Sequence, residues 1–365
     1  MRSFLRFLLL KPILWLVNRY SSSPDRLRVF SALSELKHRL ETDPGKKGFV
    51  IPFNPAAHRF IIFSDQHKGR KNGADDFMSA EKNYLEALRF YDDNQFHLIN
   101  LGDCEELWEN TMLQVLKYNE PSFQAERKFV DRRAFTKIVG NHDLDWEVDA
   151  LAPALLKKLY GTSVPVLQGV MLQSTVDGKT LRIFCTHGHQ GDLQSDGNWF
   201  SKFFVTKVWA PLQAFLHINP NTPAYDKHLK TAHNRMMYQW ASEQNHLILI
   251  TGHTHQPVFG SLTRFERLQR EHRKALYENN PEWAEAIENE MAWRSAEETE
   301  VTEDYLHMKP VYFNSGCCCF SDGDITGIEI SDGFIRLVKW EEKDGANVRV
   351  VLEETHLSNL IAEIE

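Results

Sequence analysis

The chain has 365 residues, of which 42% are hydrophobic and 25% charged, and its 19 glycines and 14 prolines are ordinary numbers for a globular protein. This composition excludes collagen-like, low-complexity and wholly disordered chains, and the length allows two domains or one large domain with insertions. The net charge of -8 argues against a nucleic-acid partner, and five cysteines without paired spacing favour free thiols in a reducing, cytoplasmic compartment.

The N-terminus is basic and apolar. Residues 1–50 contain ten Lys or Arg against four Asp or Glu. The apolar run over residues 4–17 is interrupted by Arg6 and Lys11, so it is too short and too charged to cross a bilayer, which needs ~20 apolar residues. No signal-peptide cleavage pattern follows it. Two interpretations remain: residues 1–20 bind the inner face of a membrane peripherally, or they pack on the protein or on a second subunit.

The following segments alternate between helix and strand patterns. Apolar residues at positions 30, 33, 36 and 40 recur at helical spacing and predict a helix within an N-terminal segment, residues 1–47. A second helix is expected over Ser79–Tyr91. The alternation predicts an α/β fold, with the main domain at residues 48–355 and a tail at 356–365. Five short apolar runs predict strands: Arg59–Ser64, His97–Leu101, Phe135–Val139, Leu181–Thr186 and Leu247–Thr251.

Hairpins and helical insertions are expected to extend this α/β core. Residues 192–245 are rich in aromatic residues and helix formers, and residues 264–304 are strongly charged, so each stretch predicts a helical insertion. The aromatic insertion is expected either to pack on the core or to form an apolar lid. Four Asp-Gly pairs predict hairpin turns, at residues 177–178, 322–323, 332–333 and 344–345.

Every predicted strand ends in side chains that bind metal ions. In open α/β sheets, ligands bind beyond the carboxyl ends of the strands, so these five strand ends predict one pocket. Carboxylate, imidazole and amide donors favour Mn, Fe or Zn. Two closely spaced ions need a bridging ligand, for which the Asp103 carboxylate is the candidate. The strand ends supply Asp65 and His67, then Asp103, then Asn141 with His142 and Asp143, then His187 with His189, and finally His253 with His255.

These motifs, in this order, resemble the calcineurin-like metallophosphoesterase superfamily. They are Asp65-x-His67, Gly102-Asp103, Gly140-Asn141-His142-Asp143, His187 and Gly252-His253-x-His255. The resemblance implies a four-layer α/β/β/α sandwich with helical insertions, and two divalent metal ions, with Mn favoured and Fe or Zn as alternatives. It assigns one ion to Asp65, His67, Asp103 and His255. It assigns the other to Asp103, Asn141, His187 and His253.

The resemblance also implies roles for neighbouring residues. A hydroxide held between two ions is available near neutral pH, because metal binding lowers the pKa of water towards ~7. His142 is expected to face the substrate and to protonate the leaving group, with Asp143 holding its ring. Lys68, Arg70 and His189 are further candidates for substrate binding, although as loop residues they fit a solvated surface as well. Three successive cysteines, at positions 317–319, are expected on a strand as buried side chains.

Departures from known branches narrow the expected function. Gly-Asn-His-Asp replaces the Gly-Asn-His-Glu of Ser/Thr protein phosphatases, and Glu106 stands where purple acid phosphatases have a tyrosine ligand. UDP-2,3-diacylglucosamine hydrolases share the general plan but carry arginine where this chain has His142. The leading interpretation is hydrolysis of a phosphodiester, pyrophosphate or phosphomonoester on a lipid-linked or envelope substrate. The alternatives are a soluble nucleotide or nucleic-acid phosphodiesterase, and a non-catalytic scaffold on this fold.

Overall fold

The computed structural model describes residues 25–72, 75–191, 227–294 and 307–364, and the account that follows is confined to them. The basic segment at residues 1–20 and most of the aromatic insertion, residues 192–226, lie outside the described residues. So do residues 295–304 of the charged insertion.

The first of two sheets has the strand order β1-β6-β7-β8-β9 in the described part of the chain. The pairs β1–β6, β7–β8 and β8–β9 are parallel, and β6 and β7 form an antiparallel hairpin. These strands are β1 (Gly48–Pro52), β6 (Gly169–Val176), β7 (Lys179–Thr186), β8 (Leu247–Thr251) and β9 (Tyr312–Asn314).

The second sheet has the order β12-β11-β10-β2-β3-β4-β5 among the described strands. The pairs from β2 to β5 are parallel, whereas β10, β11 and β12 are antiparallel additions at the other side of β2. Its strands are β2 (Phe60–Phe63), β3 (His97–Leu101), β4 (Phe135–Ile138), β5 (Val166–Leu167), β10 (Ile325–Ser331), β11 (Phe334–Lys343) and β12 (Ala346–His356).

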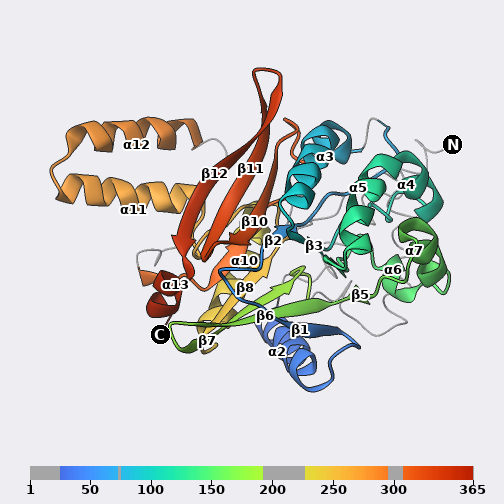
Figure 1. Ribbon diagram of the computed structural model, residues 1–365. Helices are drawn as coiled ribbons and strands as arrows, with labels where there is room; N and C mark the ends of the chain where they lie inside the picture. The colour runs from blue at the N-terminus through green and yellow to red at the C-terminus, as the bar shows by residue number, and fades with distance from the viewer. Residues whose placement is uncertain (1–24, 73–74, 192–226, 295–306, 365) are drawn as a thin grey trace, which may run out of the picture.

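Helices cover the outer faces of both sheets, which confirms the predicted four-layer α/β arrangement (Figure 1). Strand β2 shows the reason for the layers. Its Phe60 and Ile62 join the core between the sheets, and its Ile61 and Phe63 pack beneath α3 (Phe77–Asp93). A parallel strand buried on both faces reads as a continuous apolar run. The other helices on this side are α4 (Met112–Tyr118), α5 (Glu120–Asp131), α6 (Asp145–Val148) and α7 (Ala152–Tyr160).

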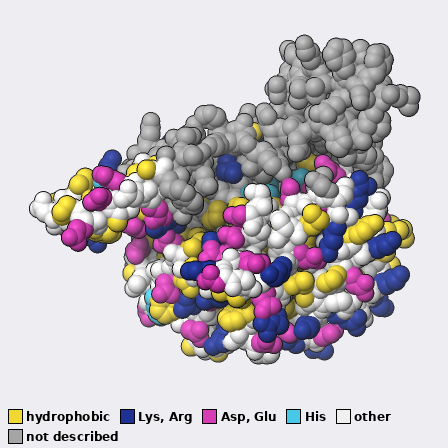
Figure 2. Space-filling view, turned by 90° about the horizontal axis from the view of Figure 1, so that it is seen from above, with side chains coloured by type: hydrophobic (Ala, Val, Ile, Leu, Met, Phe, Trp, Pro, Cys, Tyr) yellow, Lys and Arg dark blue, Asp and Glu magenta, His cyan; other side chains and the backbone are white. Residues whose placement is uncertain are grey.

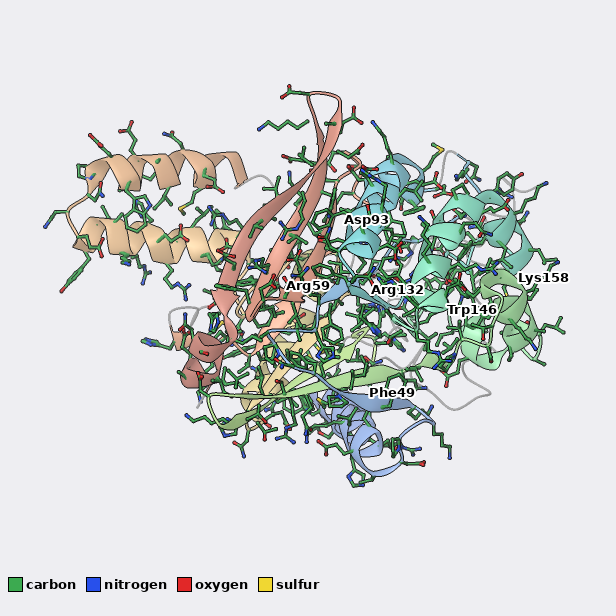
Figure 3. All side chains as sticks on the ribbon, in the orientation of Figure 1. Phe49, Arg59, Asp93, Arg132, Trp146 and Lys158 are labelled. Atoms are coloured by element: carbon green, nitrogen blue, oxygen red, sulfur yellow. The ribbon has the colours of Figure 1, made fainter. Side chains whose placement is uncertain are left out.

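The first and last described helices belong to the main core rather than to separate segments. In α2 (Arg26–Thr42), the buried residues Val29, Leu33, Leu36 and Leu40 pack against the first sheet. In α13 (Leu357–Glu363), three apolar side chains are buried in the same core. Residues 356–363, expected to form a tail, therefore close the core instead. Figure 3 shows side chains filling the space between the two sheets.

Three of the four expected Asp-Gly hairpin turns are present. In the turns at residues 177–178, 332–333 and 344–345, both residues have positive φ, the conformation of a two-residue type I′ turn. The expectation for residues 322–323 is wrong. The strand before this pair, β9, lies in the first sheet, and the strand after it, β10, lies in the second, so the segment connects two sheets.

The insertions are helical where they are described. Helix α10 (Lys227–Ser242) packs beside β8 and α2, with Trp240 Nε1 donating a hydrogen bond to Ser34 Oγ at 2.9 Å. Helices α11 (Arg264–Tyr277) and α12 (Pro281–Arg294) form a hairpin that projects from the body (Figure 1). Figure 2 shows hydrophobic, basic and acidic side chains interspersed on this hairpin. Among the described residues, no helix is long and apolar enough to span a membrane.

Replacing Leu33 with alanine tests whether α2 is part of the main core. Leu33 is fully buried, so Leu33→Ala is expected to lower the free energy of unfolding by about 2–5 kcal/mol through lost burial and a residual cavity. Leu27 lies in the same helix but is 76% exposed, and Leu27→Ala should change the free energy of unfolding by no more than about 0.5 kcal/mol. Urea unfolding of both variants measures the difference. Equal stabilities would contradict the assignment.

Candidate metal centre

The predicted ligands lie on loops that follow the carboxyl ends of strands from both sheets. Asp65, Asp103 and His253 have φ values of 53°, 51° and 69°, in the left-handed region that non-glycine residues seldom adopt. Hydrogen bonds hold the loops together: Asp65 N–H donates to Gly102 O at 3.0 Å, and His253 N–H donates to Asp65 Oδ2 at 2.9 Å. Backbone strain of this kind persists where the surrounding structure fixes it, and functional sites are common places for it.

One group of side chains contains Asp65, His67 and His255. The Nε2 atoms of the two histidines are 3.2 Å apart, and His255 Nε2 lies 3.3 Å from Asp65 Oδ1. Asp65 Oδ1 is buried and has no hydrogen-bond partner among the described residues. A buried carboxylate oxygen without a donor is costly, and a divalent cation would satisfy it. This group therefore fits a metal ion.

A second group contains Asn141, His187 and His253. His187 Nε2 lies 3.2 Å from Asn141 Oδ1, and the rings of His187 and His253 are 5.1 Å apart. Gly102, with a φ of +92°, makes room for this group, because a Cβ atom there would lie 2.7 Å from the ring of His187. Asn141, His187 and His253 are all buried.

The carboxylate of Asp103 lies between the two groups. Its Oδ2 atom is 3.2 Å from His187 Nε2 and 3.9 Å from His67 Nε2. Asp103 accordingly belongs to two clusters of possible ligands, one with His67 and His142 and the other with His187 and His253. In each cluster the possible ligand atoms lie within 4.8 Å of one another. Burial raises the pKa of Asp103, but the charges of His187 and His142 outweigh burial and hold that pKa well below its ordinary value. The structure thus brings all seven predicted ligands together.

The remote ring nitrogens of three of these histidines have partners that fix the rings. His187 Nδ1 donates to the carbonyl oxygen of Leu101 at 2.9 Å, and His67 Nδ1 lies 3.0 Å from Glu106 Oε2. His255 Nδ1 lies 3.8 Å from Cys319 Sγ. With a proton on Nδ1, each ring presents an unprotonated Nε2 to the centre, which is the usual state of a ligating histidine.

Glu106, which sequence reasoning passed over as a functional residue, holds two histidines. Its Oε2 atom lies 3.0 Å from His67 Nδ1 and 2.8 Å from His142 Nδ1. Burial raises the pKa of Glu106, but His142 and His67 outweigh burial and lower it to about 2. Burial lowers the pKa of His142, but the carboxylates of Glu106 and Asp103 raise it to about 9. The signal in the sequence is the stretch Cys-Glu-Glu-Leu-Trp that follows Asp103, in which two glutamates and a tryptophan stand close to a predicted ligand.

His142 is held by different residues from those expected. The indole of Trp108 stacks on its ring with the centroids 3.9 Å apart and the planes at 16°. Asp143, expected to orient the ring, instead accepts hydrogen bonds from the backbone N–H groups of Cys104 and Gly140, at 2.8 and 2.6 Å. The Asp143 carboxylate therefore joins the second and third ligand loops, and Glu106 orients the His142 ring.

Lys68 does not face the site as expected. Its side chain is fully buried, and its Nζ atom lies 2.6 Å from Glu126 Oε1 and 3.4 Å from Glu105 Oε1. Lys137 Nζ lies 2.8 Å from Glu105 Oε2, which also accepts a hydrogen bond at 2.7 Å from the indole of Trp146, labelled in Figure 3. Removing one partner of such a buried pair typically costs about 3–5 kcal/mol. Lys68 thus stabilises the first ligand loop through buried ion pairs and does not face the candidate site.

The remaining candidates for substrate binding differ in exposure. Arg70 is exposed at the end of the first ligand loop. His189 is buried, with its ring 5.4 Å from that of His187. His233 of α10 is a neighbour that the sequence did not indicate, because it lies far from the motifs in the chain. Its Nε2 donates to Gly188 O at 2.8 Å, and its ring lies 5.1 Å from that of His253.

The three cysteines at positions 317–319 lie in the loop after β9, so the expectation that they lie on a strand is wrong. All three are buried, as expected. Cys318 Sγ donates to Thr326 O at 3.8 Å, whereas Cys319 Sγ lies near His255. Cys319 therefore lies beside the predicted ligand His255, whereas Cys318 points elsewhere, to the carbonyl oxygen of Thr326.

Comparison with known proteins identifies the class. The family model for calcineurin-like phosphoesterases matches residues 58–257, a range that includes all seven predicted ligands, and the chain belongs to this family. Proteins of this family typically bind divalent metal ions, in agreement with the ligand clusters. No curated protein sequence matches the chain.

Three similar solved structures cover most of the chain. Vacuolar protein sorting 29 from Cryptosporidium parvum is 11% identical with a TM-score of 0.33, covering 82% of this chain and 98% of that chain. A single mutant of Vps29 from Entamoeba histolytica is 12% identical with a TM-score of 0.31, covering 81% of this chain and 99% of that chain. A dimetal phosphatase from Danio rerio is 7% identical with a TM-score of 0.32, covering 82% of this chain and 100% of that chain.

Replacing Glu106 with alanine tests its hold on the two histidines. Without the carboxylate, His67 loses the partner that orients its ring, so Glu106→Ala is expected to bind metal about 10–100-fold more weakly. Glu109 lies on the same loop but is exposed, and Glu109→Ala should bind metal as the wild type does. Competition with a chelator measures both affinities. Wild-type affinity in Glu106→Ala would show that the carboxylate does not support the ligand.

Proposed function

We propose that this protein is a dinuclear metal-dependent phosphoesterase that hydrolyses a phosphodiester, pyrophosphate or phosphomonoester bond. The observation that carries this proposal is the position of Asp103, whose Oδ2 atom lies within 3.9 Å of a histidine from each ligand group. A carboxylate placed between two sets of nitrogen and oxygen donors suits a pair of divalent ions.

The donor set favours Mn²⁺, with Fe or Zn as alternatives. One ion would be held by Asp65, His67 and His255. The other ion would be held by Asn141, His187 and His253, and Asp103 would bind both ions. When bound, such a pair supplies Lewis acidity toward the phosphoryl oxygens and a nucleophile from water near neutral pH. The chain's own carboxylates in this set, Asp65 and Asp103, leave the loaded pocket with positive charge for an anionic phosphate ester.

His142 is the proposed proton donor to the leaving group. Its Nδ1 is engaged by Glu106, so Nε2 is the ring nitrogen available to a substrate. The stack with Trp108 holds the ring in one plane. A positioned general acid of this kind typically contributes ~10²–10⁴-fold to a rate. Arg70 is proposed to bind a further anionic group of the substrate, and His189 to line the same pocket.

The proposed substrate is an amphiphilic phosphate ester, lipid-linked or from the cell envelope. This part of the proposal is supported by the sequence of residues 1–20, which has four basic and no acidic side chains around an apolar run, and by the aromatic residues between positions 199 and 216. Both stretches lie outside the described residues. On this proposal the enzyme is cytoplasmic and binds the inner face of the membrane peripherally.

Replacing the bridging carboxylate tests the dinuclear arrangement. Asp103→Ala is expected to lose both ions, because each group loses a shared ligand, whereas His67→Ala should keep much of the second site. Metal content by mass spectrometry and hydrolysis of bis-p-nitrophenyl phosphate and p-nitrophenyl phosphate measure the effects. Asp93, exposed at the end of α3 and labelled in Figure 3, supplies the control Asp93→Ala. Activity of Asp103→Ala within several-fold of wild type would rule out a catalytic bridge.

Replacing His142 separates proton transfer from metal binding. His142→Ala is expected to retain the metal content of the wild type and to lose ~10²-fold or more in kcat. His38, exposed on α2, supplies the control His38→Ala. Loss of stoichiometric metal in His142→Ala would make this residue a ligand instead. A wild-type protein that binds two ions but hydrolyses none of the phosphate esters would favour the scaffold alternative.

Vesicle binding tests the membrane part of the proposal. Each Lys or Arg close to an anionic leaflet adds ~1 kcal/mol of attraction, so the full chain should co-sediment with anionic vesicles far better than a chain starting at Ser21. Acylated substrates should be hydrolysed faster than their deacylated forms. Equal sedimentation of both chains, with no preference for the acylated substrate, would leave a soluble phosphoesterase, for which nucleotides are then the substrates to test.

A further inference from the structure

We propose that the Cys319 sulfur positions the metal ligand His255, and that oxidation of Cys319 and Cys317 to a disulfide by a peroxide weakens metal binding. The inference rests on the metal centre of the proposed function. It concerns a pair of thiols to which the hydrolytic mechanism assigns no role.

The ring of His255 spans the distance between the thiol and the centre. Its Nδ1 atom lies 3.8 Å from Cys319 Sγ, within hydrogen-bond range for sulfur, while its Nε2 atom lies 3.3 Å from Asp65 Oδ1. The Cys319 sulfur, one ring nitrogen of His67 and one ring nitrogen of His255 all lie within 4.8 Å of one another. Asp65 Oδ1, buried without a hydrogen-bond partner, faces the same group. The thiol therefore stands directly behind a ligand.

The partners of the other two rings differ from Cys319 in their chemistry. The Leu101 carbonyl and the Glu106 carboxylate do not change under oxidising conditions, whereas a thiol does. Partners behind a ligating histidine typically change metal affinity by about 10–100-fold when lost. Among the described ring partners, the sulfur is therefore the one whose covalent state can alter metal binding.

The second thiol needed for a disulfide is close by. Cys317 is separated from Cys319 by one residue, and both thiols are free and buried in the loop after β9. Cys318 points instead to the carbonyl of Thr326. Two thiols react with one hydrogen peroxide, the O–O bond breaks, an S–S bond forms between Cys317 and Cys319, and two waters leave with the thiol hydrogens and the peroxide oxygens. The S–S bond draws the Cys319 sulfur toward Cys317, so that this sulfur no longer accepts the hydrogen bond from His255 Nδ1.

The experiment uses the full chain loaded with Zn²⁺, an ion with no redox chemistry of its own. Zinc affinity is measured by chelator competition before peroxide, after peroxide and after dithiothreitol, and the disulfide is located by mass spectrometry of the peptide. The wild type and Cys318→Ser should lose at least about tenfold in zinc affinity on oxidation and recover on reduction. In Cys319→Ser the hydroxyl still accepts a hydrogen bond, so its zinc affinity should be within several-fold of that of the wild type. Peroxide should not change this affinity. Cys319→Ala should bind zinc about 10–100-fold more weakly without any oxidant.

The outcomes separate this inference from the proposed function. A wild-type protein that binds no zinc would overturn the metal centre and the inference together. A wild-type protein that binds zinc as tightly as Cys319→Ala does would overturn the positioning role alone. Zinc affinity that survives formation of the Cys317–Cys319 disulfide, or peroxide that forms no such disulfide, would overturn the role of oxidation.

Discussion

The hydrogen bond from the His253 backbone N–H to the Asp65 carboxylate, 2.9 Å long, joins the end of a strand in one sheet to the end of a strand in the other. The candidate site depends on this alignment of two sheets, because neither sheet carries all seven predicted ligands. The second sheet supplies Asp65, His67, Asp103 and Asn141, and the first supplies His187, His253 and His255. The core between the sheets therefore sets the distances within the centre, and α2 and α13 contribute to it from opposite ends of the described chain.

A layer of buried charge lies beneath the ligand loops. Lys68 and Lys137 pair with Glu105 and Glu126, and the hydroxyl groups of Tyr84 and Tyr160 donate to Glu126 at 3.0 and 2.6 Å. These groups are buried, so their stability depends on complete pairing. Lys68 directly follows the predicted ligand His67, and Glu105 lies between Asp103 and Glu106, so this layer fixes the loops that carry the predicted metal ligands.

Much of the fold could be predicted from the sequence, because the central strands are apolar on both faces and end in glycine and polar residues. The strands over His97–Leu101 and Leu247–Thr251 have the predicted limits, and the ligand motifs follow strand ends. The directions of individual side chains could not be predicted. The Lys68 side chain points into the protein and the Glu106 side chain toward the candidate site, because Asp65, His67 and Asp103 have positive φ and so break the alternation of side-chain directions along an extended chain. No sequence pattern indicates those backbone angles. For the same reason, the sequence did not predict that Glu106, rather than Asp143, would orient the His142 ring.

The pairing of β2 with β10 has a consequence for how the chain folds as it is synthesised. Ile62 pairs with Ile328, so the strand that leads into the first ligand motif obtains its second neighbour only after more than two thirds of the chain has followed it. Likewise, Gly48 of β1 pairs with Gly169 of β6. Pairings between distant residues slow folding and leave strand edges exposed in the meantime. During synthesis, β2 therefore has an unpaired edge until β10 has been made, and in that interval this edge is open to edge-to-edge aggregation.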